Sequence, residues 1–410
     1  MVLLLPDDHH SKLKVALFWA VSLTLVCGVF FLGLFFVGNN RFIQNLINKT
    51  VKSRQYEIFG FAPYWSLSKM ENIDWNTLTT FAYFSLPVTA DGSIDHGSFE
   101  FSVFEGSQLA ELIDRAKDHQ VKRVITLTQM EAPIVESFLA NPEAWNKIAD
   151  ESIRIIKEKD LDGVNIDFEY IPTNDYLRGQ FSRFIDSYTK ILKEKLNNPY
   201  ITVSVLASSV RFNKIYDIGH LAKVTDGIFV MAYDYYYPGS KTAGPTAPLY
   251  GFNNGKGPYW YDVSTAIEDF LKVADSGKII LGVPYYGWSY PVESPKPGSE
   301  RIFNLATLAT TKDKEQNNRL IAITPAGGWD NLAQVSWRGY WDKNGWHVVY
   351  LEDKKSLSKK YDFAKEKNLS GVGIWALGYD NGDNILWAVL SDKFAPNKKV
   401  VRVIKSPTQL

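Results

Sequence analysis

Three polar side chains occupy alternate positions of one short segment, Asn165, Asp167 and Glu169, and apolar residues separate them. Because the side chains of a strand point alternately to its two faces, a strand here would place the amide and both carboxyl groups on one face. Two carboxyl groups in a confined site cannot both ionise at little cost, so the pKa of one rises and that group can deliver a proton near neutral pH. This chemistry suits cleavage of a glycosidic bond. The alternative is a solvated strand end, which often carries Asp and Glu without a catalytic role.

The segment is one of eight apolar runs of strand length, separated by polar loops and helical periodicity: 58–62, 78–86, 121–128, 161–168, 201–207, 227–233, 278–284 and 371–377. One helical pattern comprises Phe181, Phe184, Ile185, Tyr188, Ile191 and Leu192, which share a helix face. Near-continuous apolar strands that alternate with helices indicate an α/β fold with a covered parallel sheet, and eight such units predict a (β/α)8 TIM barrel. A doubly wound open sheet is the alternative. In a barrel, Asp167 and Glu169 would point inward at the carboxyl end of a strand, where barrel enzymes place catalysis.

The last two runs are separated by far more chain than one helix needs. This gap is rich in aromatic residues, namely Trp329, Trp337, Tyr340, Trp341 and Trp346. We therefore expect residues 289–350 to form a small α+β insertion between the seventh and eighth strands, as one wall of a cleft.

Residues 15–38 carry no charge, and only Ser22, Thr24 and Cys27 interrupt their apolar character. A helix of this length measures about 36 Å, enough to cross a hydrocarbon core of about 30 Å. We predict an uncleaved transmembrane anchor; a cleaved, secreted form is the alternative, but the run is long for a signal peptide and no A-x-A-like cleavage site follows it. The flanking Lys and Arg residues do not favour a cytoplasmic amino terminus.

These features divide the chain into a tail (1–14), the anchor (15–38), a linker (39–55), the barrel domain (56–392) and a carboxyl-terminal tail (393–410). The whole chain has 45 Lys and Arg against 45 Asp and Glu, and this balance argues against a nucleic-acid partner. Cys27 is the single cysteine and the six His are scattered, which excludes an intramolecular disulfide and a Cys/His zinc site. The glycines at 371 and 373 lie within an apolar run, so they do not form a dinucleotide fingerprint. We expect no metal, no cofactor and no obligate protein partner.

Residues 162–169, D-x-x-N-x-D-x-E, resemble the D-x-x-D-x-D-x-E signature of glycoside hydrolase family 18, the chitinase family, with Asn165 in place of the second Asp. The resemblance extends over about residues 56–390. It includes, in order, GFAPYW at 60–65, FAYF at 81–84, MAYD at 231–234, LGVPYYG at 281–287 and GVGIWALGYD at 371–380. The segment AGPTAPL at 243–249 resembles the branch that includes bacterial spore peptidoglycan hydrolases.

The resemblance implies a retaining mechanism in which the substrate supplies its own nucleophile. Glu169 would protonate the glycosidic oxygen and later activate water, while Asp167 would orient the 2-acetamido group and stabilise the oxazolinium that it forms. Tyr233 would donate a hydrogen bond to the acetamido oxygen, and Asn165 would support Asp167. Such a mechanism requires an N-acetyl group on the cleaved sugar. We therefore expect hydrolysis of β-1,4 bonds in an N-acetylglucosamine polysaccharide, with chitin, peptidoglycan and N-glycans all open, and a catalytic domain outside the cytoplasm.

The motifs also predict substrate-binding residues. Trp375 matches the family's sugar-binding floor, although a tryptophan inside a barrel is commonly core. Further candidates are Asp234, for sugar hydroxyls, together with Met231, Tyr83, Tyr64 and Trp65.

The third strand departs from the family's S-x-G-G and reads Thr126-Leu127-Thr128-Gln129, which leaves the shape of the adjacent subsite open. A catalytically silent glycan-binding lectin on the same barrel is the competing function. Such members typically lose the acid, and the presence of Glu169 favours the enzyme.

Overall fold

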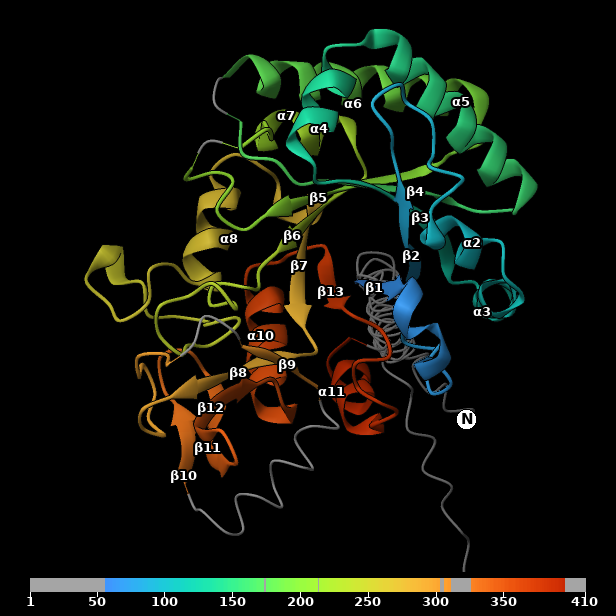
Figure 1. Ribbon diagram of the computed structural model, residues 1–410. Coiled ribbons are helices and arrows are strands. Elements are labelled where there is room, and N and C mark those ends of the chain that lie inside the picture. Colours follow the sequence, from blue (N-terminus) through green and yellow to red (C-terminus); the bar gives the residue numbers. More distant parts are fainter. Residues whose placement is uncertain (1–55, 173–174, 213, 303–305, 311–325, 395–410) are drawn as a thin grey trace, which may run out of the picture. The chain divides into compact units, whose positions relative to one another are not determined.

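The computed structural model describes residues 56–172, 175–212, 214–302, 306–310 and 326–394 (Figure 1). The predicted membrane helix at 15–38 lies outside these residues. Within the described ranges, no helix combines the length and apolar character needed to span a bilayer.

Eight parallel strands close into a barrel, which confirms the predicted architecture over the open sheet (Figure 1). The eighth barrel strand, β13, pairs with both β7 and β1 and so completes the circle. The strands are β1 (Glu57–Pro63), β2 (Thr80–Pro87), β3 (Lys122–Gln129), β4 (Gly163–Phe168), β5 (Tyr200–Leu206), β6 (Gly227–Met231), β7 (Ile279–Pro284) and β13 (Gly371–Trp375).

The interior of the barrel is filled at its centre by aromatic and aliphatic side chains: Phe59, Phe61, Phe84, Phe229, Met231 and Ile280. Two glycines make room for the ring of Phe229. A Cβ atom would lie 2.7 Å from that ring at Gly282 and 2.0 Å from it at Gly373, so a side chain at either position would force the ring to move. The centre is therefore packed core, and any site must lie at an end of the barrel.

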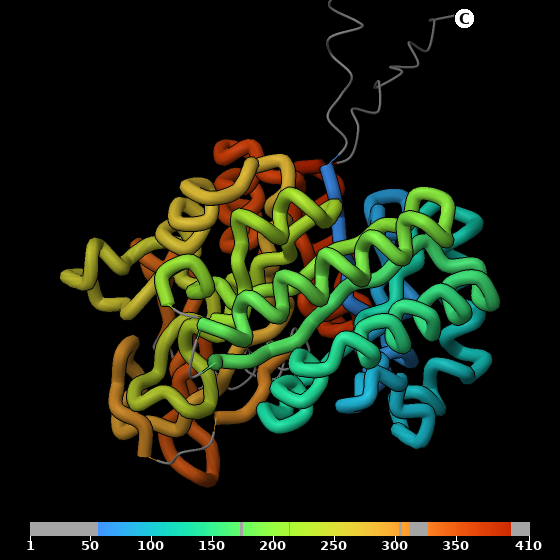
Figure 2. The backbone as a smooth tube through the Cα atoms, turned by 90° about the horizontal axis from the view of Figure 1, so that it is seen from above, coloured from blue at the N-terminus to red at the C-terminus, as the bar shows by residue number. Residues whose placement is uncertain are grey.

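Helices cover the outside of the barrel and follow the strands in the expected alternation (Figure 1). On α6, the predicted face is buried at Phe181, Phe184, Ile185, Tyr188 and Leu192. Figure 2 shows α5 and α6 side by side across one flank. The α-helices are α2 (Phe99–Phe104), α3 (Ser107–Asp118), α4 (Ala132–Leu139), α5 (Pro142–Glu158), α6 (Asp175–Lys195), α7 (Ile218–Val224), α8 (Val263–Leu271), α10 (Lys354–Glu366) and α11 (Asn384–Phe394).

Between β7 and β13 the chain forms a separate antiparallel sheet of five strands, in the order β10-β11-β12-β8-β9 (Figure 1). Its strands are β8 (Gly287–Val292), β9 (Thr307–Ala309), β10 (Ala326–Asp330), β11 (Val335–Asp342) and β12 (Gly345–Leu351). The insertion is thus where the sequence placed it, but its described residues are strand and loop, and the helical part of the α+β prediction has no counterpart among them.

The insertion is attached to the barrel by a buried ion pair. Lys360, on α10, lies 2.8 Å from the carboxylate of Glu352, which directly follows β12, and both side chains are almost completely buried. A second contact joins the two ends of the described domain, because the rings of Tyr56 and Phe394 lie 5.1 Å apart. Figure 2 shows the start of β1 beside α11.

Candidate active site

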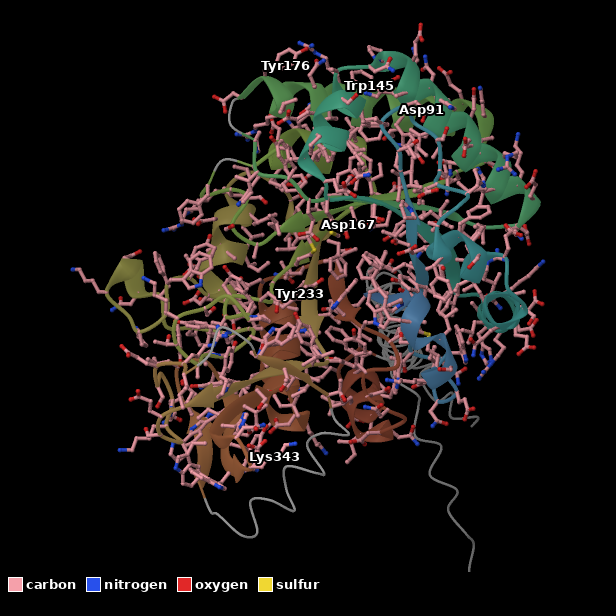
Figure 3. All side chains as sticks on the ribbon, in the orientation of Figure 1. Asp91, Trp145, Asp167, Tyr176, Tyr233 and Lys343 are labelled. Carbon is pink, nitrogen blue, oxygen red and sulfur yellow. The ribbon has the colours of Figure 1, made fainter. Side chains whose placement is uncertain are left out.

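The three polar residues of β4 lie as the alternation predicts. Asn165 and Asp167 are buried on the strand face that points into the barrel, while Val164, Ile166 and Phe168 pack in the outer core beneath the helices. Glu169 follows the last residue of β4 at its carboxyl end and is half-buried. Figure 3 shows Asp167 and Tyr233 toward the centre of the barrel, far from Trp145 and Tyr176 of the helical layer and from Lys343 of the insertion.

The electrostatics of the two carboxyl groups oppose their ionisation. Burial raises the pKa of Asp167 well above its usual range, and the negative charge of Glu169 raises it further. Burial also raises the pKa of Glu169, and the charge of Asp234 adds to that shift. Because neither group can ionise without cost to the other, one carboxyl of the pair keeps its proton to a higher pH than an isolated carboxyl would.

Tyr233 belongs to this electrostatic group. Burial raises the pKa of its phenol well above the usual value, and the charges of Asp167, Glu169 and Asp234 act in the same direction. The phenol therefore stays protonated and can serve as a hydrogen-bond donor.

Asn165 is held by the neighbouring strand β5. Its amide nitrogen donates to Ser204 Oγ at 2.9 Å, and its amide oxygen accepts from Thr202 Oγ1 at 2.9 Å. Asp167 Oδ1 is buried and has no hydrogen-bond partner among the described residues. The amide predicted to support Asp167 is thus bound to β5, and an acceptor oxygen of Asp167 remains open.

Trp375 lies at the end of β13 among aromatic rings. Its ring centroid is 4.7 Å from that of Phe84 and 6.4 Å from that of Tyr233, whose ring is inclined to it by only 24°. Trp65 stands 6.4 Å away, is 45% exposed, and donates its indole N–H to Tyr379. These rings form a partly exposed aromatic floor next to the carboxyl groups. Met231 is 8% exposed and packs in the barrel interior with Tyr233 and Trp375 at its border.

Asp234 connects the barrel to the insertion. Its Oδ1 accepts hydrogen bonds from Tyr286 Oη at 2.6 Å and from Trp288 Nε1 of β8 at 2.9 Å. Asp234 keeps some solvent-exposed surface. Burial of its carboxylate nevertheless raises its pKa, and the two hydrogen bonds offset only part of this rise. Sequence reasoning included Tyr286 in a motif without giving it a role and missed Trp288.

The two tyrosines predicted near the first strands lie differently from each other. Tyr64 is half-buried, with its ring 4.8 Å from that of Trp65, so it borders the aromatic floor. Tyr83 is 1% exposed and donates to the backbone oxygen of Glu100 at 2.6 Å, on the helix-facing side of β2. Its neighbours on the strand, Ala82 and Phe84, are the residues that face inward. Tyr83 thus lies near Tyr64, whose charge contributes to its raised pKa, but it belongs to the outer core and not to the barrel interior that holds the carboxyl pair.

Sequence reasoning also missed the hydroxyl groups that line this end of the barrel. Thr202 and Ser204 alternate with apolar residues on β5, a signal available in the sequence. On β3, Thr128 lies opposite Asp167 of β4, and its Oγ1 donates to Ser85 Oγ at 2.9 Å, so a hydrogen-bonded hydroxyl stands where the family motif has a glycine. Tyr216, from the loop before α7, donates to the backbone oxygen of Phe168 at 2.6 Å.

The described residues contain no group of three or more His, Cys, Asp or Glu arranged to hold a metal ion. A cavity of about 530 Å³ lies at the opposite, amino-terminal end of the barrel strands, where Lys122, Asp162 and Tyr200 are among its lining residues. Asp162, the first residue of the motif, is paired there with Arg123 Nε at 2.8 Å. That residue is therefore separated from the carboxyl pair by the length of β4.

The sequence profile of the glycosyl hydrolases family 18 matches residues 57–380. A relative in Bacillus anthracis, a cortical fragment-lytic enzyme, is 23% identical over 340 residues, which cover 78% of this chain and 69% of the relative. Chitinase B of Serratia marcescens is 24% identical over 312 residues, which cover 62% of this chain and 61% of that enzyme.

Solved structures show the same fold. The spore cortex-lytic enzyme SleL of Bacillus megaterium superimposes with a TM-score of 0.66 at 22% identity, covering 85% of this chain and 76% of that one. The Group IV chitinase of Ostrinia furnacalis gives a TM-score of 0.70 at 20% identity, covering 83% of this chain and all of that one. With the carboxyl pair at the carboxyl end of β4 and a profile match over most of the chain, this protein belongs to glycosyl hydrolase family 18 and is a glycosidase of that family.

Proposed function

We propose that the protein hydrolyses β-1,4 bonds of an N-acetylglucosamine polysaccharide, with retention of configuration and with the substrate's acetamido group as nucleophile. One observation carries the proposal: an inward-facing carboxyl pair, one member of which keeps a buried, unpartnered oxygen, lies beside a protonated tyrosine. This constellation offers a proton donor, an acceptor for an amide N–H and a donor for an amide oxygen. An acetamido sugar needs all three.

In the first half of the reaction, protonated Glu169 gives its proton to the glycosidic oxygen. The acetamido oxygen attacks the anomeric carbon as the leaving sugar departs, and a positively charged oxazolinium forms. Asp167 accepts the acetamido N–H and offsets the positive charge, while Tyr233 donates to the acetamido oxygen and orients it for attack. The carboxylate separation that distinguishes ordinary retaining and inverting enzymes has no bearing here, because no enzyme carboxylate attacks.

In the second half, the Glu169 carboxylate takes a proton from water as the water oxygen bonds to the anomeric carbon. The ring of the oxazolinium opens, the acetamido group is restored, and Glu169 is protonated again. Trp375 would support the apolar face of the sugar at the cleaved position, and Asp234 would bind its hydroxyl groups.

Peptidoglycan and chitin both remain candidate substrates, because one relative is named a cortical fragment-lytic enzyme and another a chitinase. The test is incubation of the protein with chitin oligomers and with peptidoglycan in parallel, with products identified by mass. We expect cleavage at N-acetylglucosamine in at least one of them. Retained binding without any product from either would establish the lectin function in place of the enzyme.

Glu169→Gln is the matched control. It keeps the shape of the side chain and removes the proton, so we expect sugar binding to persist and turnover to fall by about 10²–10⁴-fold. Near-full activity of this variant would remove Glu169 from the role of acid. A thiazoline analogue of the oxazolinium should inhibit the wild type, which tests the mechanism independently of the substrate.

The domain organisation remains part of this proposal: a membrane anchor at 15–38, a linker, the catalytic domain at 56–392 and a short tail. An anchor of this kind would hold the catalytic domain at an extracytoplasmic surface, where chitin and peptidoglycan occur. Fractionation of membranes with and without residues 1–55 tests the anchor, because only the full chain should sediment with membrane.

A further inference from the structure

The peptide that joins Phe168 to Glu169 is held from both sides. On one side, Glu169 N–H donates to the backbone oxygen of Gln129, at 3.0 Å. On the other side, the backbone oxygen of Phe168 accepts from the phenol of Tyr216 at 2.6 Å. This peptide carries the proposed acid, so its position sets where the Glu169 carboxyl can reach.

The sheet alone does not provide the second of these bonds. The pairing of β4 with β5 stops at Ile166, which lies opposite Val203, so β5 offers no backbone donor at the level of Phe168. A buried carbonyl without a donor would cost free energy. Tyr216 reaches in from the loop after β5 and supplies the donor that the ladder lacks.

Tyr216 is suited to a fixed position. It is completely buried, and its ring meets the ring of Phe181 of α6 edge to face at 5.6 Å. Burial raises the pKa of its phenol, and the charges of Glu169 and Asp167 raise it further, so the phenol remains a donor while both carboxyl groups titrate.

Gln129 holds the other side of this peptide, and it lies at the end of β3, where the sequence departs from the family motif. Its side-chain nitrogen donates to the backbone oxygen of Val88, and its side-chain oxygen accepts from the backbone N–H groups of Met130 and Glu131. The side chain therefore ties the end of β3 to the end of β2 and to the turn before α4. The backbone oxygen that holds Glu169 is part of this fixed corner.

We propose that Tyr216 and Gln129 are positioning residues that clamp the Phe168–Glu169 peptide and thereby aim the carboxyl group of Glu169. The inference rests on the proposed role of Glu169 as the acid. The clamp gives a role to Gln129, which stands where the family pattern has a glycine. It also gives a role to Tyr216, which belongs to none of the motifs found in the sequence.

The test compares Tyr216→Phe with Tyr188→Phe in the full chain. Both replace a fully buried tyrosine whose phenol donates a hydrogen bond, but Tyr188 donates to Ser152 Oγ at 2.7 Å between α5 and α6, away from the site. For Tyr216→Phe we expect kcat to fall roughly tenfold with KM unchanged, because the misplaced acid acts in the transition state. Tyr188→Phe should keep the wild-type kcat.

The pH dependence separates positioning from mere packing. The groups that face Glu169 are Asp167 on the same strand, Asp234 beyond β6, and the phenols of Tyr233 and Tyr216. A looser Glu169 gains solvent, its pKa falls toward the usual value, and the alkaline limb of kcat, where the acid loses its proton, moves to lower pH. Gln129→Leu, which removes the side-chain anchor, should move the limb the same way and provides an independent arm if Tyr216→Phe does not fold.

Each outcome decides one question. Either of two results would overturn the clamp. One is that Tyr216→Phe and Tyr188→Phe have equal kcat and equal pH dependence. The other is that the Tyr216 and Gln129 variants have a lower kcat but an alkaline limb that does not move. Activity in Glu169→Gln, measured alongside, would instead overturn the assignment of the acid. The two failures are therefore distinguishable in one experiment.

Discussion

Asp167 bears two costs to stability in the folded protein. The residue is only 2% exposed, and its Oδ1 receives no hydrogen bond from any described residue. Its folded pKa is raised by burial and by Glu169, so the ionised form that prevails in the unfolded chain at neutral pH is disfavoured in the fold. A group of this kind lowers stability at high pH and has no such effect at low pH.

Asp167→Asn should therefore raise the melting temperature by a few degrees at neutral pH while lowering turnover by orders of magnitude. The sign follows from the raised pKa: the gain should shrink as the pH falls through the folded pKa and vanish below about pH 4, where the wild-type carboxyl is protonated in both states. Thermal unfolding of both proteins over this pH range measures it. An Asn variant that melts lower than the wild type at neutral pH contradicts this account.

Asn165→Asp tests the departure from the family motif. A carboxyl at this position would be fully buried between the hydroxyls of Thr202 and Ser204 and close along the strand to Asp167. Two neighbouring carboxyls raise the pKa of the pair, so the acid limb of the activity, where ionised Asp167 takes up a proton, should move to higher pH by about one unit. An acid limb that stays in place would show that Asn165 does not tune Asp167.

At this scale the sequence predicted which side chains share a face but not their partners. Alternation along β4 was sufficient to place Asn165 and Asp167 inward, and the same alternation applied to β2 would have turned Tyr83 outward. The bond between Asn165 and Thr202 depends on the register between β4 and β5. No local pattern specifies that register, because it is set by closure of the whole barrel.

At the scale of elements, the insertion and the barrel are joined where β12 leads into α10. The Glu352–Lys360 pair at this junction is buried on both sides. Burial raises the pKa of Glu352, while the charge of Lys360 lowers it. Removal of one partner leaves an uncompensated buried charge.

Lys360→Met should lower the free energy of unfolding by about 3–5 kcal/mol. The double variant Glu352→Leu/Lys360→Met should recover most of that loss, because no charge then remains buried. Denaturant unfolding of the three proteins measures both values. A double variant as unstable as the single one would mean that the pair contributes more than compensation of charge.

The elements themselves were predictable to different degrees. The eight barrel strands carry apolar runs, and α6 carries a helical face, so their types follow from periodicity. The insertion was expected to mix helix and strand, whereas the described part is an antiparallel sheet. Its strands carry aromatic residues on both faces. On β11, Tyr340 packs with Ala309, Val349 and Leu351, whereas Trp341 next to it is 53% exposed. An aromatic residue on the exposed face removes the apolar–polar alternation by which a strand is predicted.

At the scale of the whole molecule, the described residues between 56 and 394 form a closed barrel whose helices enclose one large core, and the insertion shares a further cluster with the loop that follows β6. A protein that starts at Tyr56 should therefore unfold in one cooperative transition and cleave soluble oligomers with the kcat of the full chain. Calorimetry and kinetics on both proteins test this. A lower kcat of the shorter protein at equal melting temperature would assign a catalytic contribution to the first 55 residues.

The contact between Tyr56 and Phe394 has a consequence for how this domain can be handled. Both ends of the domain emerge together at the amino-terminal end of the barrel strands, and Glu169 lies at the other end. A support, a fluorophore or a second protein fused at either end would thus attach to the back of the enzyme. On a surface coated through such a fusion, the end of the barrel that carries Glu169 would face outward, toward a polymer too large to diffuse.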